Sequence, residues 1–354
     1  MSHLFDPLKL GDTAIRNRVW VSPMCTYSAV DGLPSDWHLV HLGQFAIGGA
    51  GLVMAEATAV APEGRISAGD AGLWNDEQVT AWRRVTNFLR EHGATPAVQL
   101  AHAGRKASTT APWEGGATLP ESEGGWQTVS STSNAFGELA APRALTEDEV
   151  AALPQQFADA ARRADEAGFE VIELHFAHGY LAHQFYSPLT NDRTDRYGGD
   201  FDGRIRVLLE IVDAVRAVWP EGRPLLARLS ATDWVEGGWT GDDSVRLSRS
   251  LARHGVDLVD ASTGGAVPDA QIPVSSGYQT RFARQIKIEA EVPTGAVGLI
   301  TSPEQAEEVV TSGSADVVLL ARELLRDPHW PLHAADRLRA ETLWPKQYER
   351  ARRG

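Results

Sequence analysis

The sequence predicts an α/β fold: a single (β/α)8 TIM barrel that spans residues 1–354 as one domain, with an N-terminal hairpin and an excursion after strand 3. Eight short apolar runs recur along the chain, and segments of helical period lie between most of them. Continuous apolar runs are typical of parallel strands that are buried on both faces. No break in composition divides the chain. A doubly wound open sheet is the alternative, but it rarely needs eight such units.

The predicted strands are 18–23, 52–57, 97–102, 171–176, 225–230, 257–262, 294–299 and 316–321. Helices are predicted over 77–93, 146–168, 203–219, 243–255, 279–290 and 302–313. Thr146 and Glu149 form a capping-box pattern at the start of one helix. Gly93 and Gly168 stand where two of the helices should end.

Two segments outside this alternation have predicted places in the barrel. The segment 9–17 contains a Gly-Asp turn, which indicates a hairpin that closes the barrel floor. The segment 104–142 is rich in Gly, Ser and Thr and falls in the longest gap between strands. Because a long loop in a compact domain is usually functional or disordered, we expect it to pass over the barrel mouth.

The charge balance and the single cysteine exclude several classes of function. Acidic residues outnumber basic residues 47 to 33, which gives a net charge of −14. Such a surface disfavours nucleic acid and anionic membranes as partners. Cys25 is the only cysteine, which excludes an internal disulfide, a cysteine zinc cluster and an iron–sulfur site. Because no apolar run is long enough for a signal peptide or a membrane span, we expect a cytoplasmic protein.

Barrel enzymes carry their chemistry at the C-terminal face of the barrel, where the strands end. Most side chains expected there are hydrogen-bond donors rather than clustered carboxylates. Such a set suits a polar ring and an anion better than a divalent metal. The set comprises Cys25, Tyr27, Glu56, Ala57, Gln99, His102, His175, His178, Tyr180, Arg228, Gly298 and Arg322.

His175 and His178 follow the fourth strand in the stretch 173-ELHFAHGYL-181. A metal site is one interpretation, but helical zinc pairs use i,i+4 spacing, and no acidic partner follows closely. A buried structural histidine is another interpretation. We favour two N–H donors for one substrate carbonyl oxygen, which stabilise the enolate that forms when a conjugated C=C accepts hydride. Tyr180 then either protonates the carbon opposite the hydride or is a rim aromatic.

Donors at other strand ends predict a flavin mononucleotide site. The amide of Gln99 can both donate to and accept from a pyrimidine-like edge. Arg228 either lies beside the negative charge of a reduced ring or forms an ion pair with Asp233 or Glu236. Barrels commonly bind phosphate after strands 7 and 8, where this chain has Gly298 and Arg322. No G-x-G-x-x-G follows a strand, so a Rossmann dinucleotide site is not supported.

Six stretches match, in the same order, motifs of the old yellow enzyme family of FMN-dependent ene-reductases, and within it the thermophilic-like class. They are 22-SPMCTYS-28, 56-EATAVAPEGRIS-67, 99-QLAHAGRKA-107, 173-ELHFAHGYL-181, 190-TNDRTDRYGG-199 and 322-RELLRDP-328. The sequence therefore resembles this family over almost its full length.

The resemblance implies a (β/α)8 barrel with non-covalent FMN, NADPH or sometimes NADH as reductant, and an activated alkene as small-molecule substrate. In the family, hydride passes from flavin N5 to the β-carbon of the alkene, and a tyrosine protonates the α-carbon. Flavin contacts are implied for Ser22, Pro23, Met24, Cys25, Ala57, Gln99, Arg228, Gly298, Ala321 and Arg322. Substrate contacts are implied for Tyr27, His175 and His178, and Tyr180 matches the proton donor.

Two further features resemble the thermophilic-like class. In that class a cysteine at the position of Cys25 touches the flavin and tunes its potential, although a lone cysteine is usually only a small buried hydrophobe. The tail 347–354 resembles a C-terminus whose arginine, here Arg350, reaches the neighbouring active site, which implies a homodimer or homotetramer. A frayed basic end is the alternative. Ala321 departs from the glycine of many relatives, so the phosphate loop must tolerate a methyl group.

Three other functions fit the sequence less well. A dienoyl-CoA reductase of the same superfamily would carry an iron–sulfur cluster, which one cysteine cannot hold. A Schiff-base lyase needs a lysine at a strand end, and only Lys106 lies near the predicted mouth. A non-catalytic FMN carrier would have no need of paired donors beside a proton donor.

Overall fold

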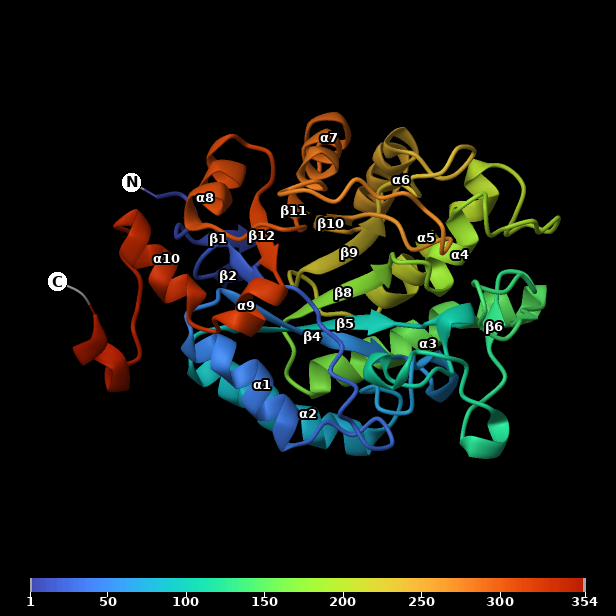
Figure 1. Ribbon diagram of the computed structural model, residues 1–354, viewed down its shortest axis with the longest axis horizontal. Coiled ribbons are helices and arrows are strands. Elements are labelled where there is room, and N and C mark those ends of the chain that lie inside the picture. Colours follow the sequence, from blue (N-terminus) through green and yellow to red (C-terminus); the bar gives the residue numbers. More distant parts are fainter. Residues whose placement is uncertain (1, 353–354) are drawn as a thin grey trace.

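The computed structural model describes residues 2–352 and contains a closed barrel of eight parallel strands (Figure 1). Around the barrel the order is β3–β4–β5–β8–β9–β10–β11–β12, so barrel strands that are neighbours in sequence are neighbours in space. The strands are β3 (Val19–Val21), β4 (Leu52–Ala59), β5 (Thr95–Ala101), β8 (Val171–Phe176), β9 (Leu225–Ser230), β10 (Leu258–Ser262), β11 (Thr294–Ala296) and β12 (Val317–Leu320). Each predicted strand overlaps one of them, and the predicted fold class is confirmed.

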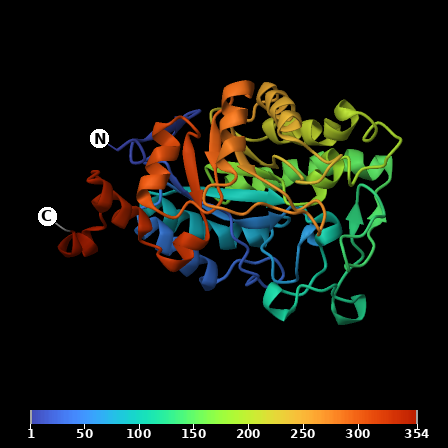
Figure 2. The ribbon, with the colours of Figure 1, turned by 45° about the horizontal axis from the view of Figure 1, so that its top comes forward.

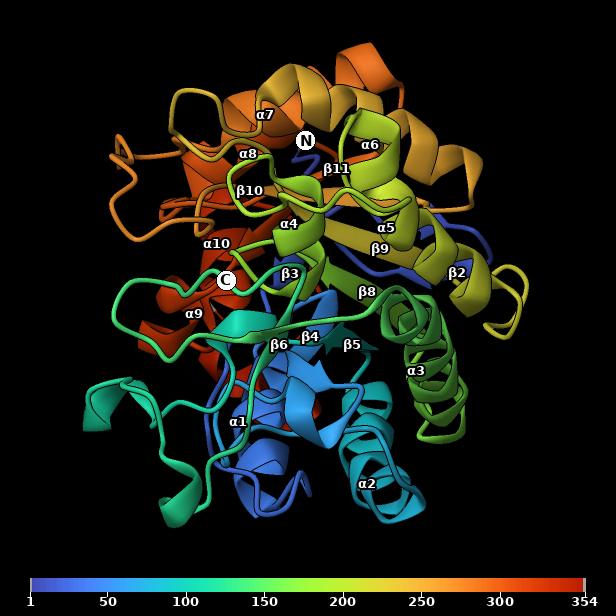
Figure 3. The same cartoon turned by 90° about the vertical axis from the view of Figure 1, so that its right-hand side faces the viewer.

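Helices surround the barrel, as the view toward the strand ends shows (Figure 3). The predicted helices correspond to α2 (Asp76–Glu91), α3 (Glu147–Glu166), α5 (Phe201–Arg216), α6 (Gly241–Arg253), α7 (Thr280–Ala290) and α8 (Pro303–Thr311). The predicted capping box is present: Thr146 Oγ1 accepts from the N–H of Glu149, and the Glu149 carboxylate accepts from the N–H of Thr146. The sequence pattern does not predict α1 (Asp36–Ile47) or α4 (Leu181–Tyr186).

An antiparallel hairpin of β1 (Leu8–Leu10) and β2 (Thr13–Ile15) closes the end of the barrel where the strands begin. Leu10 and Ile15 are buried in one apolar cluster with Leu52, Val171 and Leu258, each the first residue of a barrel strand. Burial of these side chains keeps water out of the lower barrel and fixes the hairpin against it. The predicted floor over 9–17 is confirmed.

The excursion between β5 and α3 lies on the side of the molecule toward which the strands point (Figures 1 and 3). It contains the 3-10 turns η2 (Gly104–Lys106), η3 (Pro112–Glu114) and η4 (Glu121–Glu123), and the short strands β6 (Val129–Ser130) and β7 (Arg143–Ala144). Figure 2 shows part of it extending away from the barrel. Trp126 ties it to the loop after β4, donating to the carbonyl of Glu63 at 2.9 Å. The predicted position over the mouth is confirmed.

After β12 the chain forms α9 (Arg322–Arg326), α10 (Trp330–Leu338) and the 3-10 segment η5 (Lys346–Ala351). Figure 1 places α10 and the C-terminal end of the chain at the opposite end of the molecule from β6 and the excursion. The last two residues of the predicted tail, 353–354, lie outside the described residues. Within residues 2–352, no helix is long and apolar enough to cross a membrane.

Candidate active site

The end of β8 brings three of the predicted catalytic side chains together. The ring of His175 lies edge-on to the ring of His178, with centroids 5.1 Å apart. It is also edge-on to the ring of Tyr180, with centroids 5.0 Å apart. His175 is the fifth residue of β8, and the other two lie in the turn that leads into α4. The sequence spacing alone did not show whether these three side chains come together. In the structure they do, at the C-terminal mouth of the barrel.

His175 is a neutral hydrogen-bond donor. Burial, with the positive charge of Arg228 nearby, lowers the pKa of its imidazole well below the usual value. Its Nδ1 accepts from the backbone N–H of Ala177 at 3.3 Å, so the single proton of the neutral ring lies on Nε2. That N–H is left to donate to a ligand oxygen.

His178 has the same charge state but uses its N–H within the protein. Burial and the charge of Arg228 lower the pKa of this ring well below the usual value. His178 Nε2 lies 2.7 Å from Ser262 Oγ. The Ser262 hydroxyl donates its proton to Gln279 Oε1, so a lone pair of Ser262 Oγ accepts the N–H of His178. A substrate oxygen would therefore compete with Ser262 for this donor, which the sequence did not indicate.

Tyr180 keeps its proton. Burial, with the sulfur of Cys25 and the phenol of Tyr27 nearby, raises the pKa of the Tyr180 hydroxyl well above the usual value. Tyr180 lies among mostly small residues, which are Ala57, Ala59, Gly64, Ala101 and Ala103, together with Ile66 and Asp70. A tyrosine that stays protonated at neutral pH can act as a general acid.

Below these residues, a layer of charged and amide side chains crosses the inside of the barrel. Gln99 Nε2 donates to Glu173 Oε1 at 2.7 Å, and Arg228 Nε lies 3.0 Å from Asp260 Oδ2. All four side chains are buried. Burial raises the pKa of both carboxyl groups, Glu173 with the charge of Asp260 beside it. Each pair joins two neighbouring strands of the barrel, β5 with β8 and β9 with β10.

The partner of Arg228 corrects the sequence interpretation. Asp233 and Glu236 were the predicted alternatives, but the ion pair forms with Asp260 on the neighbouring strand. Asp233 instead contacts His183 at 2.8 Å. Asp260 stands directly opposite Arg228 in the β9–β10 register. Arg228 therefore pairs with a residue of the neighbouring strand rather than with a residue of the loop after β9.

The loop after β3 carries Ser22, Pro23, Met24 and Cys25, of which Ser22 is buried and the others are partly exposed. Burial of the sulfur, with the carboxyl of Asp70 nearby, raises the pKa of the Cys25 thiol well above the usual value. Cys25 is therefore a thiol, not a thiolate, at neutral pH.

Tyr27 follows in this loop with a φ of +49°, a conformation that few non-glycine residues adopt. Its ring lies edge-on to Trp113 of the excursion, with centroids 5.6 Å apart. The excursion thus covers a predicted substrate contact. Glu56 holds the loop, because it accepts from the N–H and the hydroxyl of Thr26 at 3.2 and 2.7 Å.

The loops after β11 and β12 form the predicted phosphate end. Gly298 has a φ of +116°, and a Cβ there would lie 2.8 Å from the amide nitrogen of Gln279, so only glycine fits. Ala321 has a φ of −117°, which is not in the left-handed region that favours glycine. Arg322 begins α9 and is exposed. These are the residues that would hold a phosphate group at this end of the barrel.

The sequence missed several residues that shape this site. Glu173 and Asp260 were detectable as single charges within apolar strand runs, while Lys106 was considered only as a Schiff-base former. Asp233 was expected only as a partner of Arg228, and its fully buried pair with His183 behind the turn was not predicted. Within residues 2–352, no three histidine, cysteine, aspartate or glutamate side chains converge to hold a metal ion.

A closed parallel barrel with hydrogen-bond donors and a protonated tyrosine at its mouth defines a barrel enzyme. The sequence model of the "NADH:flavin oxidoreductase / NADH oxidase family" matches residues 3–341. An NADPH dehydrogenase of Geobacillus sp. (strain WCH70) is 46% identical over 349 residues, which cover 98% of both chains.

Two solved structures are similar in fold. Morphinone reductase has a TM-score of 0.79 at 28% identity, and the match covers 98% of this chain and 92% of that one. A 2-naphthoyl-CoA reductase complex has a TM-score of 0.85 at 25% identity, covering 94% of this chain and 52% of that one. This chain belongs to the NADH:flavin oxidoreductase family, also called the old yellow enzyme family, and is an NAD(P)H:flavin oxidoreductase.

Proposed function

We propose that this protein is an FMN-dependent ene-reductase of the thermophilic-like class, which reduces the C=C bond of activated alkenes at the expense of NADPH or NADH. The observation that carries the proposal is the arrangement at the end of β8. A neutral imidazole with its proton on Nε2 stands beside a tyrosine that keeps its proton, with ring centroids 5.0 Å apart. The name NADPH dehydrogenase of the Geobacillus relative supports NADPH as reductant.

The residues that would hold FMN lie in or directly after six of the barrel strands. They are Ser22, Pro23, Met24, Cys25, Ala57, Gln99, Arg228, Gly298, Ala321 and Arg322. One feature fits that cofactor: the buried Nε of Arg228, which has no well-aligned hydrogen bond. Bound FMN would carry hydride between the nicotinamide and the alkene.

The protein side chains would supply the polar part of the reaction. His175 and His178 donate to the carbonyl oxygen of the substrate and stabilise the enolate as its charge develops. Tyr180 gives its proton to the α-carbon, and solvent restores it. Enones, maleimides and related electrophiles share the required carbonyl next to a C=C bond. Tyr27, which lies under Trp113, would bound the substrate on the side of the excursion.

Purified protein should be yellow, and anaerobic NADPH should bleach it until 2-cyclohexenone restores the colour. Tyr180→Phe should still be bleached by NADPH but should recover its colour slowly, since the proton donor is missing. A colourless preparation that takes up no added FMN would contradict the flavin site. A variant that recovers as fast as the wild type would contradict the role of Tyr180.

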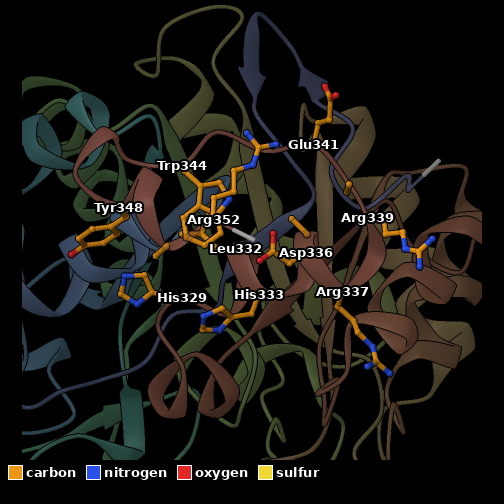
Figure 4. Close-up of a pocket in the computed structure, with 13 residues that line it drawn as sticks. His329, Leu332, His333, Asp336, Arg337, Arg339, Glu341, Trp344, Tyr348 and Arg352 are labelled. Atoms are coloured by element: carbon orange, nitrogen blue, oxygen red, sulfur yellow. The ribbon is translucent and has the colours of Figure 1, made fainter. Parts of the chain in front are cut away.

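We further propose a homodimer or homotetramer in which Arg350 reaches the active site of a neighbouring subunit. Arg350 lies in η5 and is exposed. A groove of about 1070 Å³ separates α10 from this tail, with His329, His333, Trp344, Tyr348 and Arg352 around it (Figure 4). Leu343, just before η5, is 80% exposed. These features support a contact with another chain.

A further inference from the structure

The turn after β8 carries both His178 and Tyr180, and its backbone is in an unusual conformation. His178 has a φ of +60°, in the left-handed region that favours glycine. Such a conformation persists only where surrounding contacts impose it. The N–H of His178 donates to Ser230 Oγ at 2.9 Å, and its carbonyl accepts from Lys106 Nζ at 2.8 Å. Side chains therefore restrain both backbone polar groups of this residue.

Gly179, the next residue, is restrained by two consecutive side chains of α4. Its N–H donates to His183 Nδ1 at 2.8 Å, and its carbonyl accepts from Gln184 Nε2 at 2.7 Å. A Cβ at Gly179 would lie 1.9 Å from the carbonyl oxygen of Gly265, so the turn fits closely against the loop after β10. The path of the chain into Tyr180 is thus set from α4.

A buried carboxylate decides which nitrogen of His183 carries the proton. Asp233 Oδ1 lies 2.8 Å from His183 Nε2, and both side chains are fully buried. Ser187 Oγ and the N–H of Trp239 donate to the other carboxylate oxygen at 2.6 and 2.8 Å. Although burial alone would raise it, these contacts and the imidazole lower the pKa of Asp233. The ionised carboxylate only accepts, so Nε2 carries the proton and Nδ1 remains the acceptor for Gly179.

We propose that Asp233 and His183 are positioning residues of the reaction. They fix the acceptor that holds Gly179, and through this turn they place the donor of His178 and the phenol of Tyr180. Both lie behind the turn and act through it rather than on the substrate. The inference deepens the proposed alkene reduction and rests on it.

The substitution Asp233→Asn tests the pair because it keeps the shape and changes one acceptor into a donor. If the amide oxygen faces His183, the amide nitrogen meets the N–H of Trp239. If the amide turns round, it meets Nε2 and drives the imidazole proton to Nδ1, against the N–H of Gly179. Either arrangement opposes two N–H groups, and an unsatisfied buried donor is costly. The turn should therefore shift.

The measurement compares two oxidants of the dithionite-reduced, FMN-loaded enzyme. Reoxidation by 2-cyclohexenone needs the histidine donors and Tyr180, whereas reoxidation by molecular oxygen needs neither. We expect D233N to react with 2-cyclohexenone about 10²-fold more slowly, the loss typical of a misplacement of ~1 Å. Its reaction with oxygen should stay at the wild-type rate.

Two control variants separate this effect from general perturbation. Ser187→Ala removes one donor to the same carboxylate but leaves Asp233 facing Nε2 of His183, so it should slow the reaction with 2-cyclohexenone much less than D233N does. Asp213→Asn alters a similar pair on the surface, where His254 Nδ1 lies 2.6 Å from Asp213 Oδ1. It should leave both rates unchanged. Gln184→Met removes the second side-chain bond to Gly179, together with the bonds of Gln184 to Ala103, Arg105 and Ser130, and should repeat the selective loss.

A D233N variant that is reoxidised by 2-cyclohexenone at the wild-type rate would overturn the inference. A variant that is slowed equally with both oxidants would also overturn it. If D233N does not retain flavin, Q184M decides: a selective loss supports the role of the turn, and its absence refutes it. A wild-type enzyme that never reduces 2-cyclohexenone would contradict the proposed function instead, so the two failures are distinguishable.

Discussion

Glu56, which holds the loop of Cys25 and Tyr27, is a buried carboxyl group that should stay protonated at neutral pH. Burial raises its pKa to about 8, although two hydrogen bonds from Thr26 act in the opposite direction. Its ordinary value is 4.5. An acid whose pKa is raised on folding stabilises the protein most at low pH. This contribution is lost as the pH rises from the ordinary value through the raised one.

The substitution Glu56→Gln should remove this pH dependence, because glutamine resembles the neutral acid and does not ionise. Between about pH 5 and about pH 8, the Tm of the wild type should fall relative to that of E56Q. Thermal unfolding followed by circular dichroism across this range measures the difference. Glu77→Gln, at an exposed position of α2, is the matched control and should track the wild type. Parallel profiles for wild type and E56Q would show that Glu56 is ionised in the folded protein.

The sequence predicts which side chains lie near the barrel mouth, but not which side chains they contact. Arg228 was predicted to end a strand, but it lies inside β9, and its partner depends on the register of β9 with β10, where Asp260 stands opposite it. Gln99 likewise faces Glu173 through the β5–β8 register. Continuous apolar runs contain no alternation that would fix such a register. The pairs could therefore be found only in the structure.

The contribution of the β1–β2 hairpin to the stability of the barrel can be tested with a single substitution. Ile15 is fully buried against the first residues of the barrel strands. Ile15→Ala should destabilise the holoenzyme by about 2–5 kcal/mol, the usual cost of such a truncation in a core. Lys9→Ala, on the exposed side of β1, should change little. Urea unfolding of both variants measures the difference, and equal midpoints would mean that the hairpin is not part of the cooperative core.

Elements with a clear apolar period were predictable, and elements whose buried face is polar were not. The inward face of α1 includes His38, His41 and Gly43, so its hydrophobic pattern is weak. In α4 the buried side chains include His183 and Gln184, and the helix is six residues long. These polar residues are buried because they bond to neighbouring backbone and side chains, which periodicity does not report. One of these two elements, α4, is thus the one inferred to position the reaction.

Within one chain, the barrel mouth and the C-terminal tail lie at opposite ends of the molecule, whereas the proposed assembly would bring the tail of one subunit to the mouth of another. The mouth of the barrel lies toward the excursion, whereas α10 and the C-terminal end of the chain lie at the opposite end (Figure 1). Arg350 therefore cannot serve the active site of its own chain without a large rearrangement of the tail. In a two-fold dimer each tail meets the same surface of the partner, so two equivalent sites would each receive one arginine.

Complementation between two inactive chains tests this arrangement. Arg350→Ala should lower kcat/KM for 2-cyclohexenone about 10- to 100-fold, the usual worth of a hydrogen bond from a charged group. Tyr180→Phe should also be slow.

In a hybrid of the two chains, one site has Tyr180 from the R350A chain and Arg350 from the Y180F chain. Activity should therefore reappear in hybrids isolated through two different affinity tags. A hybrid of Lys346→Ala with Y180F keeps one complete site in either geometry and sets the expected level. If the R350A–Y180F hybrid is no more active than its parents, Arg350 does not act across the interface.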